Sequence, residues 1–213
     1  MRTEEIEEAK KDINFLRASF LLIANYRQNT HIFAFMLESD EIVLQKYTTE
    51  DISLLFEAIK VSVDRVQPWL PWCHPNYTIA ETEAWVKTRP QRWNEGKEFG
   101  FSIRDRQGTI VGGCGIGIRS SPWYGNLGYW LRTGYTKKGY ATTATKLLAM
   151  FGIQQLQLKR IEIVASVDNL DSQRVAQRAG ACKEGISRNK LLIHGEFHDA
   201  VIYSFIPNDF NTD

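Results

Sequence analysis

Residues 136–166 read TKKGYATTATKLLAMFGIQQLQLKRIEIVAS, and their order of basic turn, apolar helix and β-branched run decides the fold. A helix is expected from about Lys138 to Gln155, followed by a strand in RIEIVASV. The first turn of a helix leaves backbone N–H groups unpaired and carries partial positive charge, yet this turn contains no acidic side chain. Local composition allows either a solvated basic helix start or an anion-binding site.

The segments nearer the N-terminus predict a strand and two helices. EIVLQKY, residues 41–47, predicts the strand. Apolar residues recur at helical spacing through DISLLFEAIK, residues 51–60. After a proline-rich break, Thr78 and Glu81 form the sequence pattern of a capping box, which predicts a second helix to about Asn94.

The period then changes from helical to extended. EFGFSIRD, residues 98–105, and TIVGGCGIGIR, residues 109–119, predict a hairpin around the turn RQG. LGYWLRT, residues 127–133, predicts a third strand. The glycines of GGCGIG, residues 112–117, precede no helix, so they do not match a dinucleotide-binding fingerprint.

Beyond the central stretch, one more helix and two strands are expected. The helix runs from about residue 170 to 178, and Gly180 is typical of a helix end. KLLIH, residues 190–194, and EFHDAVIYSFI, residues 196–206, flank a glycine and predict the final pair of strands. The order of elements predicts a mixed α/β or α+β sheet with helices on both faces.

Charge and cysteine content exclude several classes of protein. The 26 basic and 25 acidic side chains nearly cancel, so no global field favours a stable nucleic-acid partner or an anionic membrane. Cys73, Cys114 and Cys182 are far apart and form no CxxC pair, which argues against a disulfide framework or a structural zinc site. We expect no metal, no membrane span and a cytoplasmic location.

The first residues differ in character from the rest. EEIEEAKKDINFLRASFLLIANY has helical spacing, so residues 1–37 are expected to be a helical appendage and residues 38–213 the main domain. Met36 offers an alternative start codon. Residues 1–35 are therefore either part of the native chain, if translation starts at Met1, or untranslated, if it starts at Met36.

The stretch from residue 128 to 148, GYWLRTGYTKKGYATTATKLL, resembles motif A of the GNAT N-acetyltransferase superfamily, R/Q-x-x-G-x-G/A. YTTED, PWLPW and NLDSQRVAQRAGACKEG resemble its RimJ/RimL-type branch, which acetylates protein N-termini and related amines. The similarity covers about residues 41–206. It implies a mainly antiparallel sheet of about seven strands, with a splayed pair of strands that holds acetyl-CoA.

The resemblance also implies residues that bind the cofactor. The pantetheine arm of acetyl-CoA is expected against Leu131, Arg132 and Thr133, and Asn169 is expected to bond its amides. Motif A starts at Thr136 in place of the usual arginine or glutamine, so affinity is expected to depend more on the neighbouring lysines. The turn expected to hold the pyrophosphate comprises Thr136, Lys137, Lys138, Gly139, Tyr140, Ala141 and Thr142.

Ser172 is the expected catalytic residue. In the N-x-x-S segment it would point at the sulfur of the cofactor and position or protonate the leaving thiolate. Many relatives carry a tyrosine four residues later for this purpose, where this chain has Ala176. The alternative is that Ser172 only caps the helix that follows.

The loop WLPWCHP, residues 69–75, is expected to bind the acceptor through Trp69, Trp72 and His74. Amphipathic aromatic side chains on a proline-stiffened loop suit the wall of a substrate groove. The alternative is that the two tryptophans only cover the edge of the core.

The function expected from this resemblance is acetyl transfer from acetyl-CoA to a primary amine, either a protein N-terminal α-amine or a small amine, by direct attack on the thioester. Four side chains are candidates for the general base: His74, Glu98, Glu196 and Asp199. The alternative is a catalytically silent CoA-binding or interaction module. The protein is expected to be a monomer or a homodimer.

Overall fold

The computed structural model describes residues 36–119 and 121–210, so the helix expected within residues 1–35 lies outside the described residues. The first described strand, β1 (Met36–Glu38), pairs antiparallel with β2 (Ile42–Lys46). The sheet therefore includes Met36 and Leu37, which precede the expected start of the domain.

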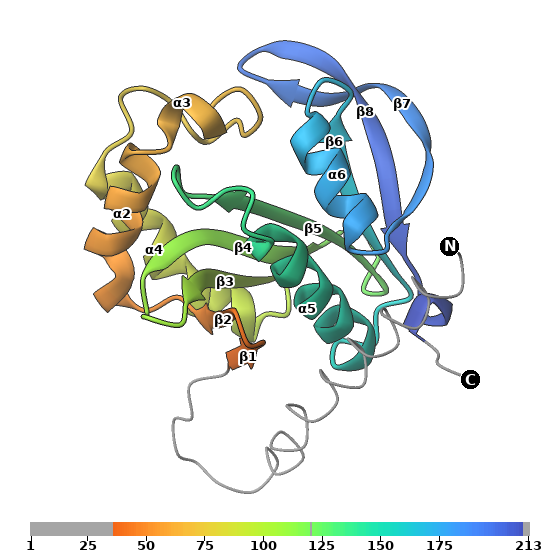
Figure 1. The fold of residues 1–213 in the computed structure, drawn as a ribbon, viewed down its shortest axis with the longest axis horizontal. Coiled ribbons are helices and arrows are strands. Elements are labelled where there is room, and N and C mark those ends of the chain that lie inside the picture. The colour runs from red at the N-terminus through yellow and green to blue at the C-terminus, as the bar shows by residue number, and fades with distance from the viewer. Residues whose placement is uncertain (1–35, 120, 211–213) are drawn as a thin grey trace, which may run out of the picture.

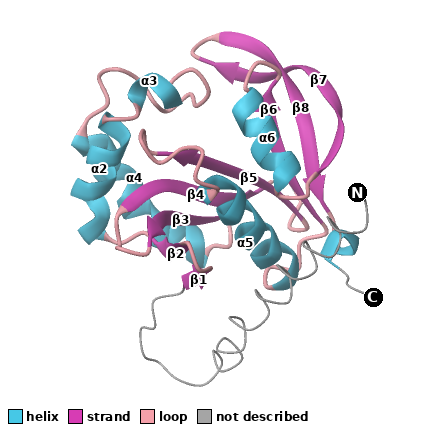
Figure 2. Cartoon of the chain, in the orientation of Figure 1, coloured by secondary structure: helices cyan, strands magenta, loops and turns pink. Residues whose placement is uncertain are grey.

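The remaining elements follow the predicted order (Figure 2). Two short 3-10 turns, at 49–51 and 207–210, and a short helix after α2 were not expected. The elements are α2 Ile52–Lys60, α3 Val63–Val66, α4 Ile79–Asn94, β3 Glu98–Asp105, β4 Ile110–Ile118, β5 Tyr124–Leu131, α5 Tyr140–Gln154, β6 Arg160–Ser166, α6 Leu170–Arg178, β7 Cys182–Ile193 and β8 Glu196–Phe205.

Within the described residues, eight strands form one sheet in the order β1-β2-β3-β4-β5-β6-β8-β7. Every pairing is antiparallel except β5 with β6. The predicted mixed, mainly antiparallel sheet is thereby confirmed. The predicted hairpin and third strand form the meander β3-β4-β5.

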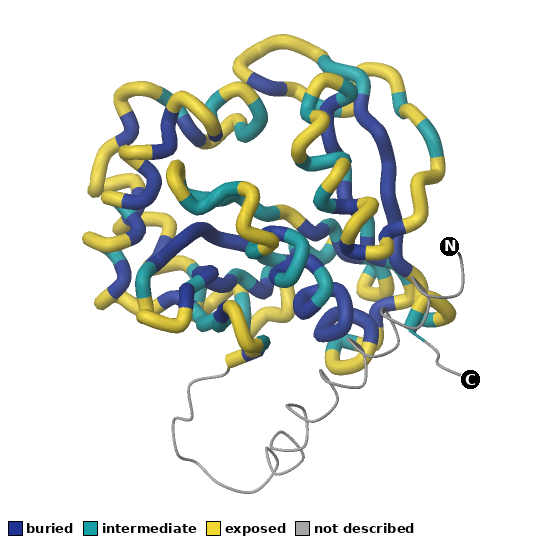
Figure 3. Tube along the Cα trace, in the orientation of Figure 1, coloured by how far each residue is buried: buried dark blue, intermediate teal, exposed yellow. Residues whose placement is uncertain are grey.

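Helices cover both faces of the sheet, as predicted (Figure 1). On β3, a Cβ at Gly100 would lie 3.9 Å from the side chain of Arg89 in α4. Its neighbours Phe99 and Phe101 instead contact Phe151 of α5, with ring centroids 5.8 and 5.7 Å apart. Because successive residues of a strand point to opposite faces, α4 and α5 lie on opposite sides. The buried chain lies mainly in β3, β4, α5 and the second half of β8 (Figure 3).

Local signals placed two helix boundaries correctly. The Thr78 backbone N–H donates to Glu81 Oε2 at 2.9 Å, and the Glu81 N–H donates to Thr78 Oγ1 at 3.4 Å, which completes the predicted capping box of α4. After α6, Gly180 has φ +92°, a conformation that favours glycine.

The strand β7 begins at Cys182, eight residues before the predicted start. Residues 182–190 are polar and largely exposed on an edge strand, and the register shifts twice along it. An exposed edge strand needs no regular alternation of apolar residues, so periodicity could not reveal it.

Candidate active site

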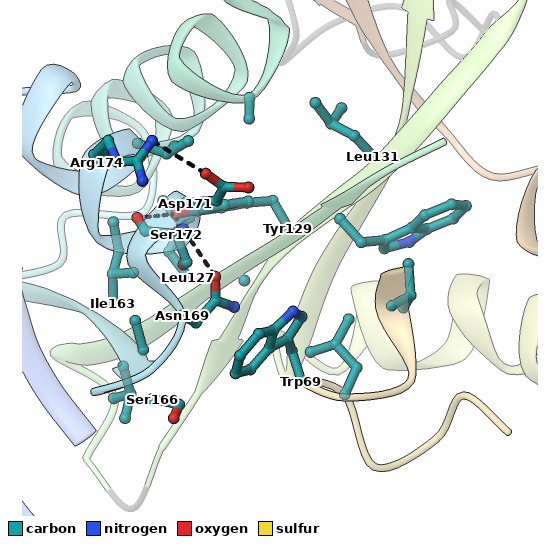
Figure 4. A pocket seen from close by; sticks show the side chains of 18 of the residues that line it. Trp69, Leu127, Tyr129, Leu131, Ile163, Ser166, Asn169, Asp171, Ser172 and Arg174 are labelled. Carbon is teal, nitrogen blue, oxygen red and sulfur yellow. Dashed lines mark hydrogen bonds and ion pairs between the residues drawn. The ribbon is translucent and has the colours of Figure 1, made fainter. Parts of the chain in front are cut away.

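The sheet opens between β5 and β6. These strands pair at only three positions, residues 124–126 against 160–162. On their other sides, β5 stays paired with β4 up to Leu131, and β6 stays paired with β8 up to Ser166. A cavity of about 900 Å³ lies at the opening (Figure 4). The splayed pair of strands that the resemblance implied is thereby confirmed.

Two of the amides expected to bind the pantetheine arm are engaged elsewhere. The Arg132 N–H donates to the Val111 carbonyl at 2.8 Å, and the Thr133 N–H donates to Ser62 Oγ at 2.9 Å. Neither Arg132 nor Thr133 lines the cavity. The structure does not support these two amides as cofactor donors, because each already has an acceptor within the protein.

The backbone of β5 presents other groups to the opening. The Arg132 N–H points to β4, and the backbone groups of successive residues in a strand point to opposite sides. The N–H and C=O groups of Leu131 and Tyr129 therefore point away from β4, toward β6. Both residues line the cavity. An extended ligand that bonds to β5 would therefore meet Leu131, as expected, together with Tyr129.

The start of α5 forms one end of the cavity. Gly139, its N-cap, has φ +85°, and Lys137 has φ +64°. The Thr143 N–H makes the first bond of the helix, to the Gly139 carbonyl at 3.0 Å, so the preceding amides have no acceptor within the helix. The expected turn residues that line the cavity are Thr136, Lys137, Gly139, Tyr140, Ala141 and Thr142.

Lys138 is the exception in this turn. It does not line the cavity, and its ammonium lies over the ring of Tyr135, 4.9 Å from the centroid. A carboxylate also reaches the same turn from the loop before β2, because Glu41 Oε2 accepts from Thr143 Oγ1 at 3.2 Å. The sequence near motif A gave no sign of this acidic neighbour.

Asn169 and Ser172 lie at the start of α6. Asn169 is the N-cap, and its side-chain oxygen accepts from the Ser172 backbone N–H at 3.0 Å. Both residues line the cavity. The alternative that Ser172 caps this helix is therefore wrong, since the cap is Asn169 and the Ser172 hydroxyl takes no part in it.

Tyr129 of β5 contacts Ser172 across the opening, a contact that no local sequence pattern indicates. Its phenol oxygen lies 2.9 Å from the Ser172 carbonyl oxygen and 3.0 Å from Ser172 Oγ. Burial raises the pKa of Tyr129 to about 12. Strand alternation places Tyr129 on the same face as Leu127 and Leu131, but it cannot say which helix covers that face.

The aromatic loop divides into two parts. Trp69 lines the cavity and points into it (Figure 4), whereas Trp72 and His74 do not line it. Trp72 packs against Trp130 at 6.1 Å between ring centroids. His74 Nε2 lies 2.8 Å from Glu81 Oε1, so the imidazole is tied to the capping box of α4. Of the three expected acceptor-binding residues, only Trp69 is placed to contact a ligand in the cavity.

Two contacts bridge the cavity from the segment around α3. Arg65 pairs with Asp171 of α6 at 3.8 Å, and His194 Nε2 in the β7–β8 turn lies 3.0 Å from the Gln67 carbonyl oxygen. The charged residues that line the cavity are mainly basic: Arg65, Arg119, Lys137, Arg174, Arg178 and Lys190, against Asp168 and Asp171. This balance favours an anionic ligand.

None of the four candidate general bases lines the cavity. Glu98 pairs with Arg89 at 2.6 Å, and His74 with Glu81. Asp199 Oδ1 accepts from the Asn189 N–H at 2.9 Å.

Over residues 36–119 and 121–210, no three histidine, cysteine or acidic side chains gather where they could hold a metal ion. In the same residues, no helix is long and apolar enough to cross a membrane.

The chain resembles known acetyltransferases in sequence. A family described as "Acetyltransferase (GNAT) domain" matches residues 41–181. The chain is 34% identical over 84 residues to "Putative ribosomal N-acetyltransferase YdaF" of Bacillus subtilis (strain 168), a match that covers 39% of this chain and 46% of that protein. It is 28% identical over 136 residues to "Probable N-acetyltransferase YjcK" of the same organism, covering 62% of this chain and 75% of that protein.

Solved structures share the fold. A "putative ribosomal-protein-serine acetyltransferase from Vibrio cholerae" superposes with a TM-score of 0.70 and 28% identity, covering 81% of this chain and 98% of that one. RimL, a ribosomal L7/L12 α-N-protein acetyltransferase in complex with coenzyme A, superposes with a TM-score of 0.75 at 21% identity, and covers the same shares of the two chains. At that identity the likeness to RimL concerns the fold.

The splayed sheet, the basic helix start and the family match together place this chain among the acetyl-CoA-dependent acetyltransferases. This chain belongs to the GNAT acetyltransferase family. The predicted class, an acetyl-CoA-dependent acetyltransferase, is thereby confirmed.

Proposed function

We propose that the protein acetylates the N-terminal α-amine of a protein or peptide, with a small amine as the alternative acceptor. The observation that carries this proposal is one continuous cavity, which extends from the first turn of α5 along β5 and β6 to Ser172 and the aromatic loop. The relatives named as ribosomal-protein acetyltransferases support a protein N-terminus as the acceptor class.

Each part of the cavity matches one part of acetyl-CoA. The free amides and Lys137 at the start of α5 suit the pyrophosphate. The free backbone groups of Tyr129 and the Leu131 carbonyl, on the open edge of β5, suit the amides of the pantetheine arm, because an extended chain can add hydrogen bonds to a free strand edge. Ser172 and Asn169, at the far wall, suit the thioester and the adjacent amide.

The acceptor amine must lose a proton before it can attack, because an α-amine with a pKa of about 8 is mostly protonated at neutral pH. None of the four candidate bases lines the cavity, whereas Asp168 and Asp171 do, so we assign the first proton acceptor to one of these two carboxylates, directly or through water. The Leu131 N–H faces the opening and can donate to the carbonyl oxygen as charge develops there. The Ser172 hydroxyl donates to the departing sulfur.

The test is a thiol-release assay with acetyl-CoA and a panel of N-terminal peptides and small amines. We expect release with at least one acceptor, and Ser172→Ala should lower kcat about 10-fold or more. The helix cap uses the backbone N–H of residue 172 and is kept, so this variant should lose only the hydrogen bond to Tyr129, about 2–4 °C in melting temperature.

Two outcomes would contradict the proposal. Binding of acetyl-CoA without thiol release, across the whole panel, would support the catalytically silent module instead. Unchanged turnover by Ser172→Ala at every pH would leave the acetyltransferase class intact and remove the role assigned to Ser172.

A further inference from the structure

The phenol oxygen of Tyr129 lies 3.0 Å from the hydroxyl oxygen of Ser172 (Figure 4). We propose that Tyr129 is a positioning residue, which holds the Ser172 hydroxyl so that its hydrogen points to the departing sulfur. This inference rests on the role proposed above for Ser172.

The position of Tyr129 follows from the splayed strands. The residue lies on β5 beyond the three positions where β5 pairs with β6. Its ring spans from this strand to the first turn of α6, where the phenol oxygen lies 2.9 Å from the Ser172 carbonyl oxygen and 3.0 Å from Ser172 Oγ. Both residues line the cavity, so the contact is next to the space that a ligand would fill.

The number of hydrogens limits what this contact can do. The phenol has one hydrogen, and the carbonyl oxygen of Ser172 can only accept. When the phenol donates to the carbonyl, the Ser172 hydroxyl can donate back to the phenol oxygen, and its hydrogen points away from the cavity ligand. When the phenol donates to Ser172 Oγ, the Ser172 hydrogen is released to another acceptor.

The second arrangement is the one that catalysis needs. Negative charge on the sulfur draws the hydrogen of the Ser172 hydroxyl toward the sulfur and away from the phenol oxygen. The Tyr129 phenol then donates its own hydrogen to Ser172 Oγ. Two O–H bonds rotate, while the heavy atoms stay in place. A hydroxyl that accepts a hydrogen bond is also a stronger donor, so Tyr129 increases the effect of Ser172 on the sulfur.

The phenol keeps its hydrogen throughout the working pH range, because burial raises the pKa of Tyr129 to about 12. Tyr129 is therefore able to donate its hydrogen to Ser172 Oγ, which lies 3.0 Å away. On α6 itself, Ala176 is fully buried and carries no polar atom on its side chain. The hydroxyl next to Ser172 is instead that of Tyr129, which comes from β5 on the opposite side of the opening.

A double-mutant cycle tests this inference on the full-length protein. Tyr129→Phe, Ser172→Ala and the double variant are compared in the thiol-release assay at saturating acetyl-CoA. We expect Tyr129→Phe to lower kcat about 5-fold, the loss of one hydrogen bond, with the KM for acetyl-CoA within about 2-fold. In the Ser172→Ala background, the same change should leave kcat unaltered.

The melting temperature separates positioning from a structural role. Tyr129→Phe also removes the bond to the Ser172 carbonyl, and this loss should lower the melting temperature in both backgrounds. A structural effect on turnover would likewise appear in both backgrounds. Tyr124→Phe is the matched control, since it removes a phenol from the closed end of the same strand and should leave kcat unchanged.

Three results would overturn the inference. If Ser172→Ala lowers kcat and Tyr129→Phe does not, Ser172 keeps its role and Tyr129 loses its own. If the two reductions multiply, Tyr129 acts independently of Ser172. If Ser172→Ala leaves kcat unchanged, both roles fall, although the acetyltransferase activity of the wild-type protein still stands.

Discussion

At the scale of single residues, the start of α5 combines groups that attract and repel an anion. Lys137 and the free amides of the first turn attract phosphate. Glu41, which is exposed and bonded to Thr143 Oγ1, places a carboxylate beside the same turn. A Cβ on Gly139 would lie 3.7 Å from this carboxylate. The affinity for CoA should therefore depend on an acidic residue that belongs to another element.

Glu41→Gln should lower the KM for acetyl-CoA, because it removes a negative charge near the expected position of the pyrophosphate. A charge at a helix terminus contributes about 0.3–1 kcal/mol, so the expected change is about 2- to 5-fold, with kcat unchanged. The change should shrink at high salt.

Glu38→Gln provides the control, since Glu38 is also exposed but pairs with Arg106 at 3.1 Å on the β1 edge. An unchanged or higher KM for Glu41→Gln would contradict the prediction.

At the scale of the elements, a polar network links the three strands beyond the opening. Arg160 of β6 donates to Glu162 at 2.7 Å and to Glu184 of β7, where its Nη1 lies 2.7 Å from Oε1. The Ser204 hydroxyl of β8 donates to the same carboxylate oxygen at 2.7 Å. The hydrogen bonds from Arg160 and Ser204 lower the pKa of Glu184 to about 2.

Glu184→Gln should destabilise the protein in a pH-dependent way. The pKa of Glu184 is lower in the folded protein than its ordinary value of 4.5, so the ionised carboxylate stabilises the fold above about pH 4.5. This contribution is lost as the pH falls through about 2. Because the side chain is 38% exposed, the effect at neutral pH should be small, about 2–4 °C in melting temperature.

The measurement is thermal unfolding of wild type and Glu184→Gln between pH 7 and pH 2. The difference in melting temperature should be largest at neutral pH and disappear near pH 2. A difference that stays constant with pH would show that the charge of Glu184 contributes nothing.

At the scale of the whole molecule, the opening lies between two parts of one sheet. The strands β1 to β5 form one part, and β6, β8 and β7 form the other. Three residue pairs join β5 to β6, and the contacts of Arg65 with Asp171 and of Gln67 with His194 bridge the cavity. A ligand that bonds both inner edges would add to these few connections.

Desulfo-CoA should therefore stabilise the whole protein and protect both edges from hydrogen exchange. At about 100 times its Kd, a ligand adds about 2.7 kcal/mol, which corresponds to about 5–10 °C in melting temperature. We expect the largest gain in exchange protection at residues 127–131, 138–143 and 163–166. AMP is the control, because it lacks the pantetheine arm and should leave residues 127–131 unprotected. Protection by desulfo-CoA that stops at the helix start would contradict binding along the strands.

Much of the fold could be predicted from local patterns. The capping box of Thr78 and Glu81, the glycine after α6 and the change from helical to extended periodicity all involve residues near one another in the chain. Their energies depend little on the rest of the structure. The edge strand β7 was only partly predicted, because a polar exposed strand carries no such pattern.

The sequence by itself determined the order of the longer helices and strands, the basic helix start and the acetyltransferase family to which these belong. Only the tertiary structure decided which side chains meet at the opening. Tyr129 and Ser172 are 43 positions apart, and Glu41 and Thr143 are 102 apart. Such contacts depend on how strands and helices pack in space, and one sequence read along its length contains no periodic signal for them. For the same reason Trp69 reached the cavity, while Trp72 and His74, only a few residues away, packed elsewhere.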